Sequence, residues 1–305
     1  FISISTLIKL SQEISNFAYS HISDSLEMHL DILTTSLLIL ISFLISLYGS
    51  IVGFGGGIFI VPILITFFHF EFGTAVGTTM ASLIPSAFIS TFLNRKNKNV
   101  DFKMGTLLEL PTMLGVIIGS LLVSYIAVND LKLVFVIIIF LLGLSFFIKF
   151  KSKIGNFNLF DKMNKLKPSF IIKNKNHSVA YRASIYMLMF FGLLSGTLAG
   201  MFGMGGGFMK TPIMIKVFKI PAKIATATAL FMIMITSITG TVSHYLQGHI
   251  YLIKALPVII GFALGAVVGH KVNTHIKSAS LEKLIGLALI LASMTMLANL
   301  LSNLR

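Results

Sequence analysis

The chain alternates between long apolar runs and short polar breaks. Eight runs have about the 20 residues that an α-helix needs to cross the roughly 30 Å hydrocarbon core of a bilayer. These runs lie at 33–52, 72–93, 105–128, 131–149, 183–202, 221–245, 252–272 and 281–301. Two further runs, 58–70 and 208–219, are shorter and at about 1.5 Å per residue would reach little more than half of that core. The pattern predicts an all-α polytopic membrane protein that also contains two half-length helices.

A glycine cluster precedes each short run, and the two clusters reveal an internal repeat. The residues 53–57, GFGGG, match 203–207, GMGGG, at an offset of 150. The same offset aligns Pro62 with Pro212, Ala75 with Ala225, Thr78 with Thr228 and Thr91 with Thr241. After a few lost residues, Pro111, Gly115 and Gly119 align with Pro257, Gly261 and Gly265. We therefore expect an N-terminal tail at 1–32, a first transmembrane repeat at 33–150, a linker at 151–182 and a second repeat at 183–305.

Composition and charge agree with a membrane protein. Hydrophobic residues make up 55% of the chain and charged residues 11%, against about 25% charged in soluble domains. The chain has no cysteine, which excludes thiol and cysteine–metal chemistry. The net charge is +14, and nine of the 24 basic residues lie between Lys149 and Arg182. This concentration predicts a basic cytoplasmic linker rather than a nucleic-acid surface. Residues 1–32 lack the pattern of a signal peptide, and we expect an interfacial helix or a loose tail there.

The basic residues also decide between two arrangements of the repeats. If each repeat crosses the membrane four times, the repeats are parallel and the basic residues, Lys210 left out, divide 16 to 7 between the two sides. If each long–short pair is instead a re-entrant hairpin, each repeat has three full spans, the repeats are inverted and the division becomes 19 to 4. The second arrangement obeys the positive-inside rule better and is common in secondary transporters. It places 94–103, 150–182 and 272–280 in the cytoplasm, and 244–252 and both termini outside.

The glycine clusters are the strongest candidates for function. Glycines in an apolar run leave backbone N–H groups uncovered, and lipid cannot satisfy these groups. The N-terminus of the following half-helix points back at each cluster, and a helix N-terminus attracts anions. The predicted anion-binding residues are Gly55, Gly56, Gly57, Gly205, Gly206 and Gly207. The alternative is a helix break that serves tight packing alone.

The repeated motif Gly-x-Gly-Gly-Gly-x-x-x-x-Pro resembles the pattern of the sulfite exporter TauE/SafE family of membrane transporters. Its second copy, residues 203–212, is the closer match. The segment ATAT at 225–228 and the spacing of His244 and Gly248 are also similar to the family. The likeness covers both repeats, and it implies a transporter of small oxyanions or sulfur-containing organic anions such as sulfite and sulfonates.

The first copy departs from this pattern. Ile60 stands where the second copy has Lys210, and Asn94 stands where it has His244. Lys210 follows the glycines by three residues, and a lysine at membrane depth is by default a functional hypothesis. We expect its charge to hold the anion. The alternative is that Lys210 extends to the membrane interface, as expected for Lys216.

Four further side chains are weaker candidates. Thr78 and Thr228, which the repeat aligns, could donate hydroxyl hydrogen bonds to an oxyanion, although such threonines more often serve packing. His244 and Glu109 could carry protons for coupled transport, and an interfacial position is the simpler interpretation of each.

The sequence therefore predicts a secondary transporter of small anions, working by alternating access at a midplane site made by the two glycine loops. A passive anion channel that uses the same loops as its filter is the alternative. No Walker, HExxH or GxSxG motif is present, so we expect neither ATP hydrolysis nor another enzymatic activity. We expect no cofactor or metal and no nucleic-acid partner. The expected location is the plasma or bacterial inner membrane, and assembly of several copies of the chain is left open.

Overall fold

The computed structural model describes residues 32–96, 98–123, 125, 128–147, 162–174, 179–275 and 278–302. By internal contacts the chain divides into the unit Phe1–Leu37 and the unit Leu38–Arg305. Of the first unit only residues 32–37, the beginning of a helix, are described. The prediction for the tail at 1–32 thus lies almost wholly outside the described residues. The arrangement discussed below concerns the second unit.

The described residues form ten helices and one two-stranded sheet. The helices are α2 (Ile32–Val52), α3 (Gly57–Phe67), α4 (Phe72–Lys96), α5 (Phe102–Leu122), α6 (Val128–Leu144), α8 (Ile185–Phe202), α9 (Gly207–Lys216), α10 (Ala222–Leu246), α11 (Leu252–His275) and α12 (Ser278–Ser302). Each long apolar run predicted as a helix is one, and the two short runs are the short helices α3 and α9. Hydrophobic run length alone therefore located every described helix to within a few residues.

Six of the described helices are long and apolar enough to cross a membrane, namely α2, α4, α5, α8, α10 and α11. The prediction that these six runs form helices long and apolar enough to cross a membrane is confirmed. The helix α6 has 17 residues, and the apolar part of α12, Lys283–Ala298, is also shorter than a full span. The chain is thus a mostly helical, polytopic membrane protein, as predicted.

The linker contains a hairpin that the sequence did not predict. Strands β1 (Ser169–Asn174) and β2 (Val179–Ser184) pair antiparallel, with Ser169 opposite Ser184. Residues 148–161 and 175–178 lie outside the described residues. Apolar and polar residues alternate over only a few positions here, and charged residues interrupt the alternation. Hydropathy alone therefore does not predict the two strands.

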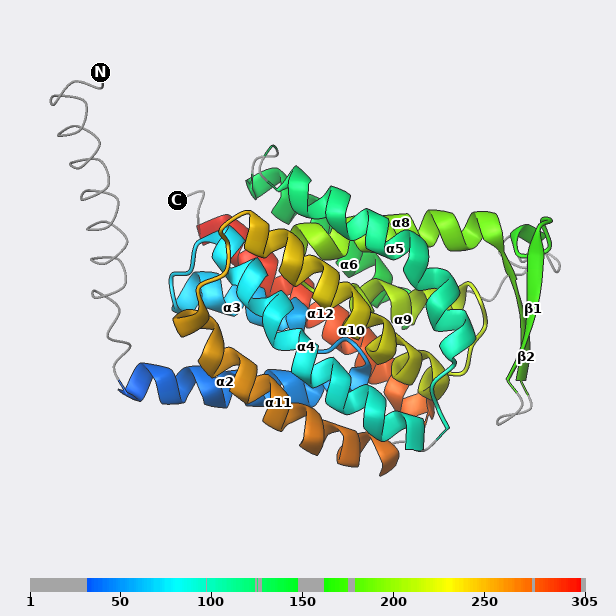
Figure 1. Ribbon diagram of the computed structural model, residues 1–305, viewed down its shortest axis with the longest axis horizontal. Helices are drawn as coiled ribbons and strands as arrows, with labels where there is room; N and C mark the ends of the chain where they lie inside the picture. The colour runs from blue at the N-terminus through cyan, green and yellow to red at the C-terminus, as the bar shows by residue number, and fades with distance from the viewer. Residues whose placement is uncertain are drawn as a thin grey trace, which may run out of the picture. The chain divides into compact units, whose positions relative to one another are not determined.

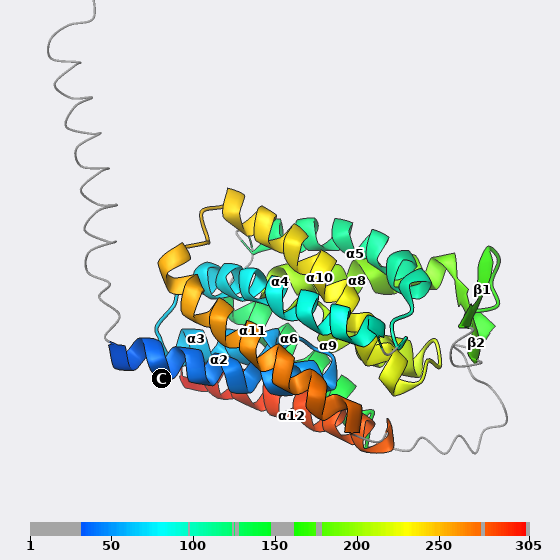
Figure 2. The same cartoon turned by 60° about the horizontal axis from the view of Figure 1, so that its bottom comes forward.

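Small residues bring the helices of the two repeats into close contact. The helix α5 packs along α8, and a Cβ built on Gly196 of α8 would lie only 2.1 Å from the Thr112 carbonyl oxygen of α5. The helix α11 packs along α2 in the same way, and a Cβ on Gly265 would lie 2.3 Å from the Phe43 carbonyl oxygen. Figures 1 and 2 show both pairs side by side. Glycine stripes let helix backbones approach in a membrane, so the third long helix of each repeat packs on the first helix of the other.

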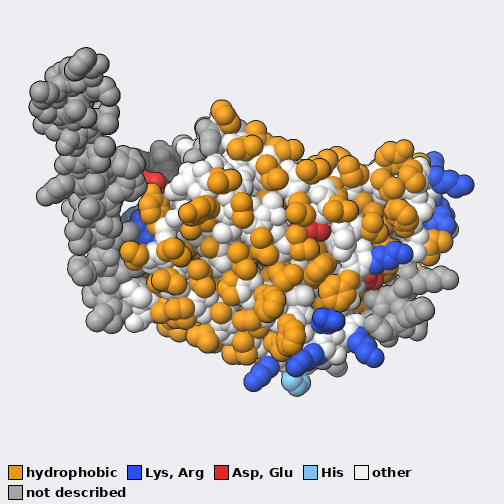
Figure 3. All heavy atoms as spheres, in the orientation of Figure 1, with side chains coloured by type: hydrophobic (Ala, Val, Ile, Leu, Met, Phe, Trp, Pro, Cys, Tyr) orange, Lys and Arg blue, Asp and Glu red, His pale blue; other side chains and the backbone are white. Residues whose placement is uncertain are grey.

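The outward surface of these helices is apolar. Large hydrophobic side chains such as Leu110 and Leu114 of α5 and Phe190 of α8 are more than half exposed. In Figure 3 hydrophobic side chains cover most of the visible face, and Lys and Arg gather toward the end that carries β1 and β2. An apolar belt of this size on a monomer is typical of a surface that faces lipid.

Candidate functional site

The two glycine loops meet in the interior of the protein. A Cβ built on Gly57 would lie 2.9 Å from the Met204 Cα, and one on Gly207 would lie 2.9 Å from the Gly53 carbonyl oxygen. The Thr211 hydroxyl donates to the same Gly53 oxygen at 3.2 Å. All residues of both loops are buried. Two segments that lie 150 residues apart therefore form one structural unit.

The contacts around the loops are reciprocal. Gly53 of the first loop lies against Thr226 of α10, and Gly203 of the second loop lies against Val76 of α4. Gly203 lies 150 residues after Gly53, and Thr226 lies 150 residues after Val76, which is the offset of the sequence repeat. Leu83 of α4 contacts Gly55 and Gly205, and its aligned residue Ile233 of α10 contacts the same two glycines. Each of these contacts of one loop is therefore matched by a contact of the other loop at the aligned position.

Each half-helix begins at a glycine in the left-handed conformation. The N-cap of α3 is Gly56 with φ 98°, and the N-cap of α9 is Gly206 with φ 72°. Only glycine adopts this conformation at no steric cost. In the first loop, however, the N–H groups of Gly53, Phe54 and Gly55 all donate to the Gly49 carbonyl oxygen, at 2.9, 2.9 and 3.1 Å. The N–H of Gly55 is therefore engaged within its own loop.

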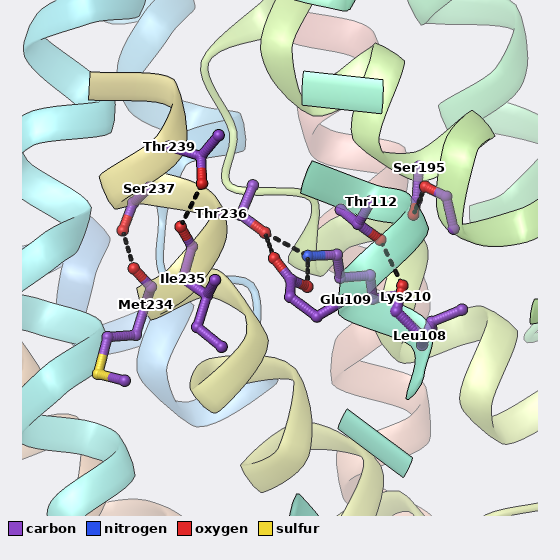
Figure 4. Close-up of polar contacts among 11 residues, drawn as sticks. Leu108, Glu109, Thr112, Ser195, Lys210, Met234, Ile235, Thr236, Ser237 and Thr239 are labelled. Atoms are coloured by element: carbon purple, nitrogen blue, oxygen red, sulfur yellow. Dashed lines mark hydrogen bonds and ion pairs between the residues drawn. The ribbon is translucent and has the colours of Figure 1, made fainter. Parts of the chain in front are cut away.

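Beside the second loop, three polar side chains from three helices form a buried cluster. The Lys210 ammonium of α9 donates to Glu109 Oε2 of α5 at 2.7 Å. Lys210 also bonds to the Thr236 hydroxyl of α10, and that hydroxyl donates to Glu109 Oε1. Figure 4 shows the three side chains pointing toward one another. Lys210 is 0% exposed and Glu109 2% exposed, so the two charges are held inside the protein.

This cluster bears on two residues singled out from the sequence. Lys210 does not extend into solvent, because its ammonium is fully buried. Glu109 is buried against Lys210. No sequence pattern indicated that these two residues pair, and Thr236 was missed altogether. The run of small polar residues in α10 could have indicated Thr236. Threonine is common in membrane helices, however, so such a run does not single out one residue.

The positions that align with this cluster carry no charge, and they come from both repeats. Ile60 aligns with Lys210, Ala255 with Glu109 and Ser86 with Thr236. Ile60, Ala255 and Ser86 are all 0% exposed. The Ser86 hydroxyl lies 3.1 Å from the Ser46 hydroxyl. The same architecture is thus built once with an ion pair and once without charge.

The two predicted threonines differ from each other. Thr228 Oγ1 accepts a hydrogen bond from the Asp101 N–H at 2.9 Å, so it lies at the beginning of α5. Thr78 is 0% exposed, and its hydroxyl has no hydrogen-bond partner within the described part of the chain. Buried hydroxyls are generally paired, which leaves Thr78 available for a ligand.

His244 is buried at the C-terminal end of α10. Its Nε2 lies 3.1 Å from the Gly200 carbonyl oxygen, and its Nδ1 lies 3.1 Å from Nδ1 of His249. The carbonyl can only accept, so His244 Nε2 carries the hydrogen, and in the neutral ring Nδ1 accepts from His249. The side chain of His244 is 0% exposed, so it packs inside the protein rather than in solvent.

The linker hairpin is attached to the beginning of α5. The Asp101 carboxylate accepts from the Met104 N–H at 3.0 Å, which caps the helix, and its second oxygen accepts from the Tyr181 hydroxyl of β2. Burial, together with the Asp101 carboxylate, raises the pKa of Tyr181. Asn164 donates to the Val217 carbonyl oxygen just beyond α9 at 2.9 Å. The linker thus contacts both α5 and α9, the helices that supply Glu109 and Lys210.

Comparison with known proteins identifies the family. The family profile of the sulfite exporter TauE/SafE matches residues 38–296. This chain belongs to that family. The match includes both glycine loops and all three residues of the Lys210–Glu109–Thr236 cluster.

Curated relatives are membrane transporters by name. The probable membrane transporter protein YunE of Bacillus subtilis is 29% identical over 267 residues, which cover 84% of this chain and 94% of the relative. A probable membrane transporter protein of Methanocaldococcus jannaschii is 29% identical over 275 residues, with the same two coverages. No solved structure matches the chain. As a TauE/SafE family member, this chain is a multi-pass protein of the cell membrane and a membrane transporter.

Proposed function

We propose that this TauE/SafE protein is a secondary transporter that moves small anions, sulfite or sulfur-containing organic anions such as sulfonates. The two glycine loops form the binding site near the midplane, and alternating access exposes it to each side. Lys210 supplies the positive charge for the anion, and the N–H groups at Gly56, Gly57, Gly206 and Gly207 and the Thr78 hydroxyl are its candidate donors. The observation that carries this proposal is the meeting of the loops beside a buried lysine.

The direction of the helices supports inverted repeats. The helices α4 and α10 align in the sequence and pack against each other. In Figures 1 and 2 they run in opposite directions. A two-fold axis that reverses membrane helices must lie in the membrane plane, which is the symmetry of many alternating-access transporters. The short helices α3 and α9 each return toward the end from which α2 or α8 entered, as expected for re-entrant hairpins.

Burial of the loops favours a transporter over a channel. Leu83 and Ile233 lie against both loops, and each loop covers the other. An anion therefore needs a rearrangement of α4 and α10 to reach the glycines. A filter for passive conduction would have to be continuous with water on both sides.

Uptake by purified protein in liposomes tests the proposal. Sulfite, sulfate, thiosulfate and ethanesulfonate are supplied one at a time, with and without a proton gradient. We expect saturable uptake of at least one sulfur oxyanion or sulfonate, and accumulation against its gradient. Passive equilibration with large single-channel currents would indicate the channel, and no uptake of any of the four anions would contradict the proposal.

The first residue-level prediction concerns Lys210→Met. This substitution keeps the side-chain length and removes a charge-assisted hydrogen bond, which contributes about 1.5–3 kcal/mol. The half-saturation concentration of uptake should therefore rise about tenfold to a hundredfold. Lys216→Met is the matched control, because that lysine donates to the Ser145 carbonyl oxygen at an exposed position. An unchanged half-saturation in Lys210→Met, or a larger defect in Lys216→Met, would move the anion site elsewhere.

A further inference from the structure

We infer that Glu109 and Lys210 couple the anion to one proton. The anion replaces the Glu109 carboxylate on the Lys210 ammonium, and Glu109 crosses in the protonated form. This inference rests on the proposed function, and it adds the ion that moves with the substrate. Its basis is a contact: a Glu109 carboxylate oxygen lies 2.7 Å from the Lys210 ammonium, the group that would hold the anion.

The fold itself does not require this ion pair. Taking two charges out of water is costly, and replacing a buried pair by apolar side chains often leaves stability unchanged or raises it. The aligned positions show such a replacement, because Ile60 of the first repeat and Ala255 of the second occupy them and are fully buried. The charged pair occurs in one copy of a repeated architecture, beside one glycine loop. A role in ion binding accounts for this asymmetry, whereas a role in packing does not.

Glu109 and an anion compete for the same partner. A Cβ built on Gly206 would lie 3.0 Å from the Lys210 Cε, so the lysine stem passes directly beside the second loop. An anion at that loop would approach the ammonium next to an ionised carboxylate. Two negative charges at one buried site raise the proton affinity of the carboxylate, and it binds a proton rather than stay ionised.

The charge balance then follows. Without substrate, the buried site holds Lys210⁺ and Glu109⁻. With a monoanion, it holds Lys210⁺, the anion and protonated Glu109. Both states are neutral, so both can change access without moving an uncompensated charge through a low-dielectric interior. The proton binds from the side to which the site is open, and it leaves on the other side when the anion departs and the carboxylate returns to Lys210. One monoanion and one proton thus cross together.

Few other groups can take part in this exchange. The helices α8, α9 and α10 surround Glu109, and their titratable side chains besides Lys210 are Tyr186, Lys216, Lys223, His244 and Tyr245. Lys210 is the ionisable side chain that contacts Glu109 in the described part of the chain. His244 bonds to Gly200 and His249 instead. Thr236 bridges the pair and can donate to either the carboxylate or an incoming oxyanion.

Proton movement with the anion is the direct test. Liposomes that enclose a pH-sensitive dye receive thiosulfate or ethanesulfonate, neither of which carries a proton near neutral pH. For an anion that the protein takes up, the lumen should acidify in step with uptake. For a monoanion, an inward proton gradient of one pH unit should drive about tenfold accumulation, because one unit corresponds to a factor of ten.

Glu109→Gln separates coupling from binding. Glutamine has the shape of the protonated carboxyl group and cannot release a proton. This variant should exchange external for internal anion, should lose accumulation driven by the proton gradient, and should show an exchange rate independent of pH. The double variant Glu109→Ala with Lys210→Ile copies the residues at the aligned positions, Ala255 and Ile60. It should remain folded, with an unchanged unfolding temperature, and should transport no anion.

Each outcome bears on one of the two proposals. Uptake without lumen acidification, or proton-driven accumulation that persists in Glu109→Gln, overturns the coupling and leaves the transporter proposal intact. Absence of uptake by the unmodified protein overturns both. Loss of folding in the double variant would show that the pair is structural and would overturn the coupling argument from asymmetry.

Discussion

At the level of single residues, three pairs of ionisable side chains are held by direct contacts in the described part of the chain. Glu109 pairs with Lys210, Asp101 with Tyr181, and His244 with His249. Buried polar groups are costly unless they are hydrogen-bonded. Two of the three pairs join segments that are far apart in the sequence. A charge change at Glu109 or Lys210 would therefore affect both α5 and α9.

The histidine pair predicts a stability that depends on pH. Burial lowers the pKa of His249, and the nearby Glu71 carboxylate opposes this shift in part. The unfolded chain then binds more protons than the folded protein as the pH falls below the ordinary histidine value of about 6.5, so stability is present above that value and is lost below it. Protonation of His244 at Nδ1 would also place two Nδ1–H donors against each other, 3.1 Å apart. The unfolding temperature in detergent should fall as the pH decreases from about 7.5 to about 5.5.

The first repeat supplies the control for this pair. Asn94 and Asn99 align with His244 and His249, and the Asn99 N–H donates to the Asn94 carbonyl oxygen, as the His249 N–H does to that of His244. The double variant His244→Asn with His249→Asn keeps this turn and removes both imidazoles. The unfolding temperature of this variant should change much less than that of the unmodified protein between about pH 7.5 and about pH 5.5. An equal fall in unfolding temperature in both proteins would assign the dependence to other groups.

At the level of secondary structure, the half-helices α3 and α9 are the unusual elements. Each follows a loop in which three glycines have positive φ. Each contains a proline at its sixth residue, Pro62 or Pro212. Non-helical backbone at membrane depth is tolerated only where protein or a wet cavity covers it. Here each glycine loop is covered by the other loop and by the half-helix that follows it.

Side chains at the N-caps of the half-helices should abolish transport. A Cβ at Gly56 would lie 3.0 Å from the Ile45 carbonyl oxygen, and a Cβ at Gly206 would lie 3.0 Å from the Lys210 Cε. Gly56→Leu and Gly206→Leu should therefore remove anion uptake in liposomes while much of the protein still inserts. Gly248→Leu is the matched control, since Gly248 has φ 74° but nothing within 4 Å of its Cβ position. Wild-type rates in both N-cap variants would exclude the loops as the anion site.

At the level of the whole chain, the two repeats interleave. The helix α5 of the first repeat packs on α8 of the second, and α11 of the second packs on α2 of the first. Neither repeat therefore buries its own glycine stripes. Because each repeat packs on the other, we expect the protein to unfold as a single cooperative unit rather than as two independent halves. The two glycine loops lie at the centre of the contacts between the repeats.

Two aligned turns test whether the repeats are inverted. Lys98 and Gly248 are related by the offset of 150, both have positive φ, and both are exposed. The chain has no cysteine, so single cysteines at these positions have no background. In intact cells an impermeant thiol reagent should label Gly248→Cys and spare Lys98→Cys, because the basic residues around position 98 place it in the cytoplasm. Labelling of both or of neither would indicate parallel repeats, and labelling of position 98 alone would reverse the orientation.

The sequence by itself determined the class of protein, the helices and the family. Hydrophobic run length is a local property, so it located α2 to α12 without knowledge of their contacts. The repeat also singled out both glycine loops, Lys210 and the residues that differ between copies. Only the tertiary structure decided that Glu109 pairs with Lys210, from 101 positions away, and that His244 is buried against the Gly200 carbonyl oxygen. Such contacts depend on which helix faces pack together, and glycine stripes set that packing at a range that no local pattern records.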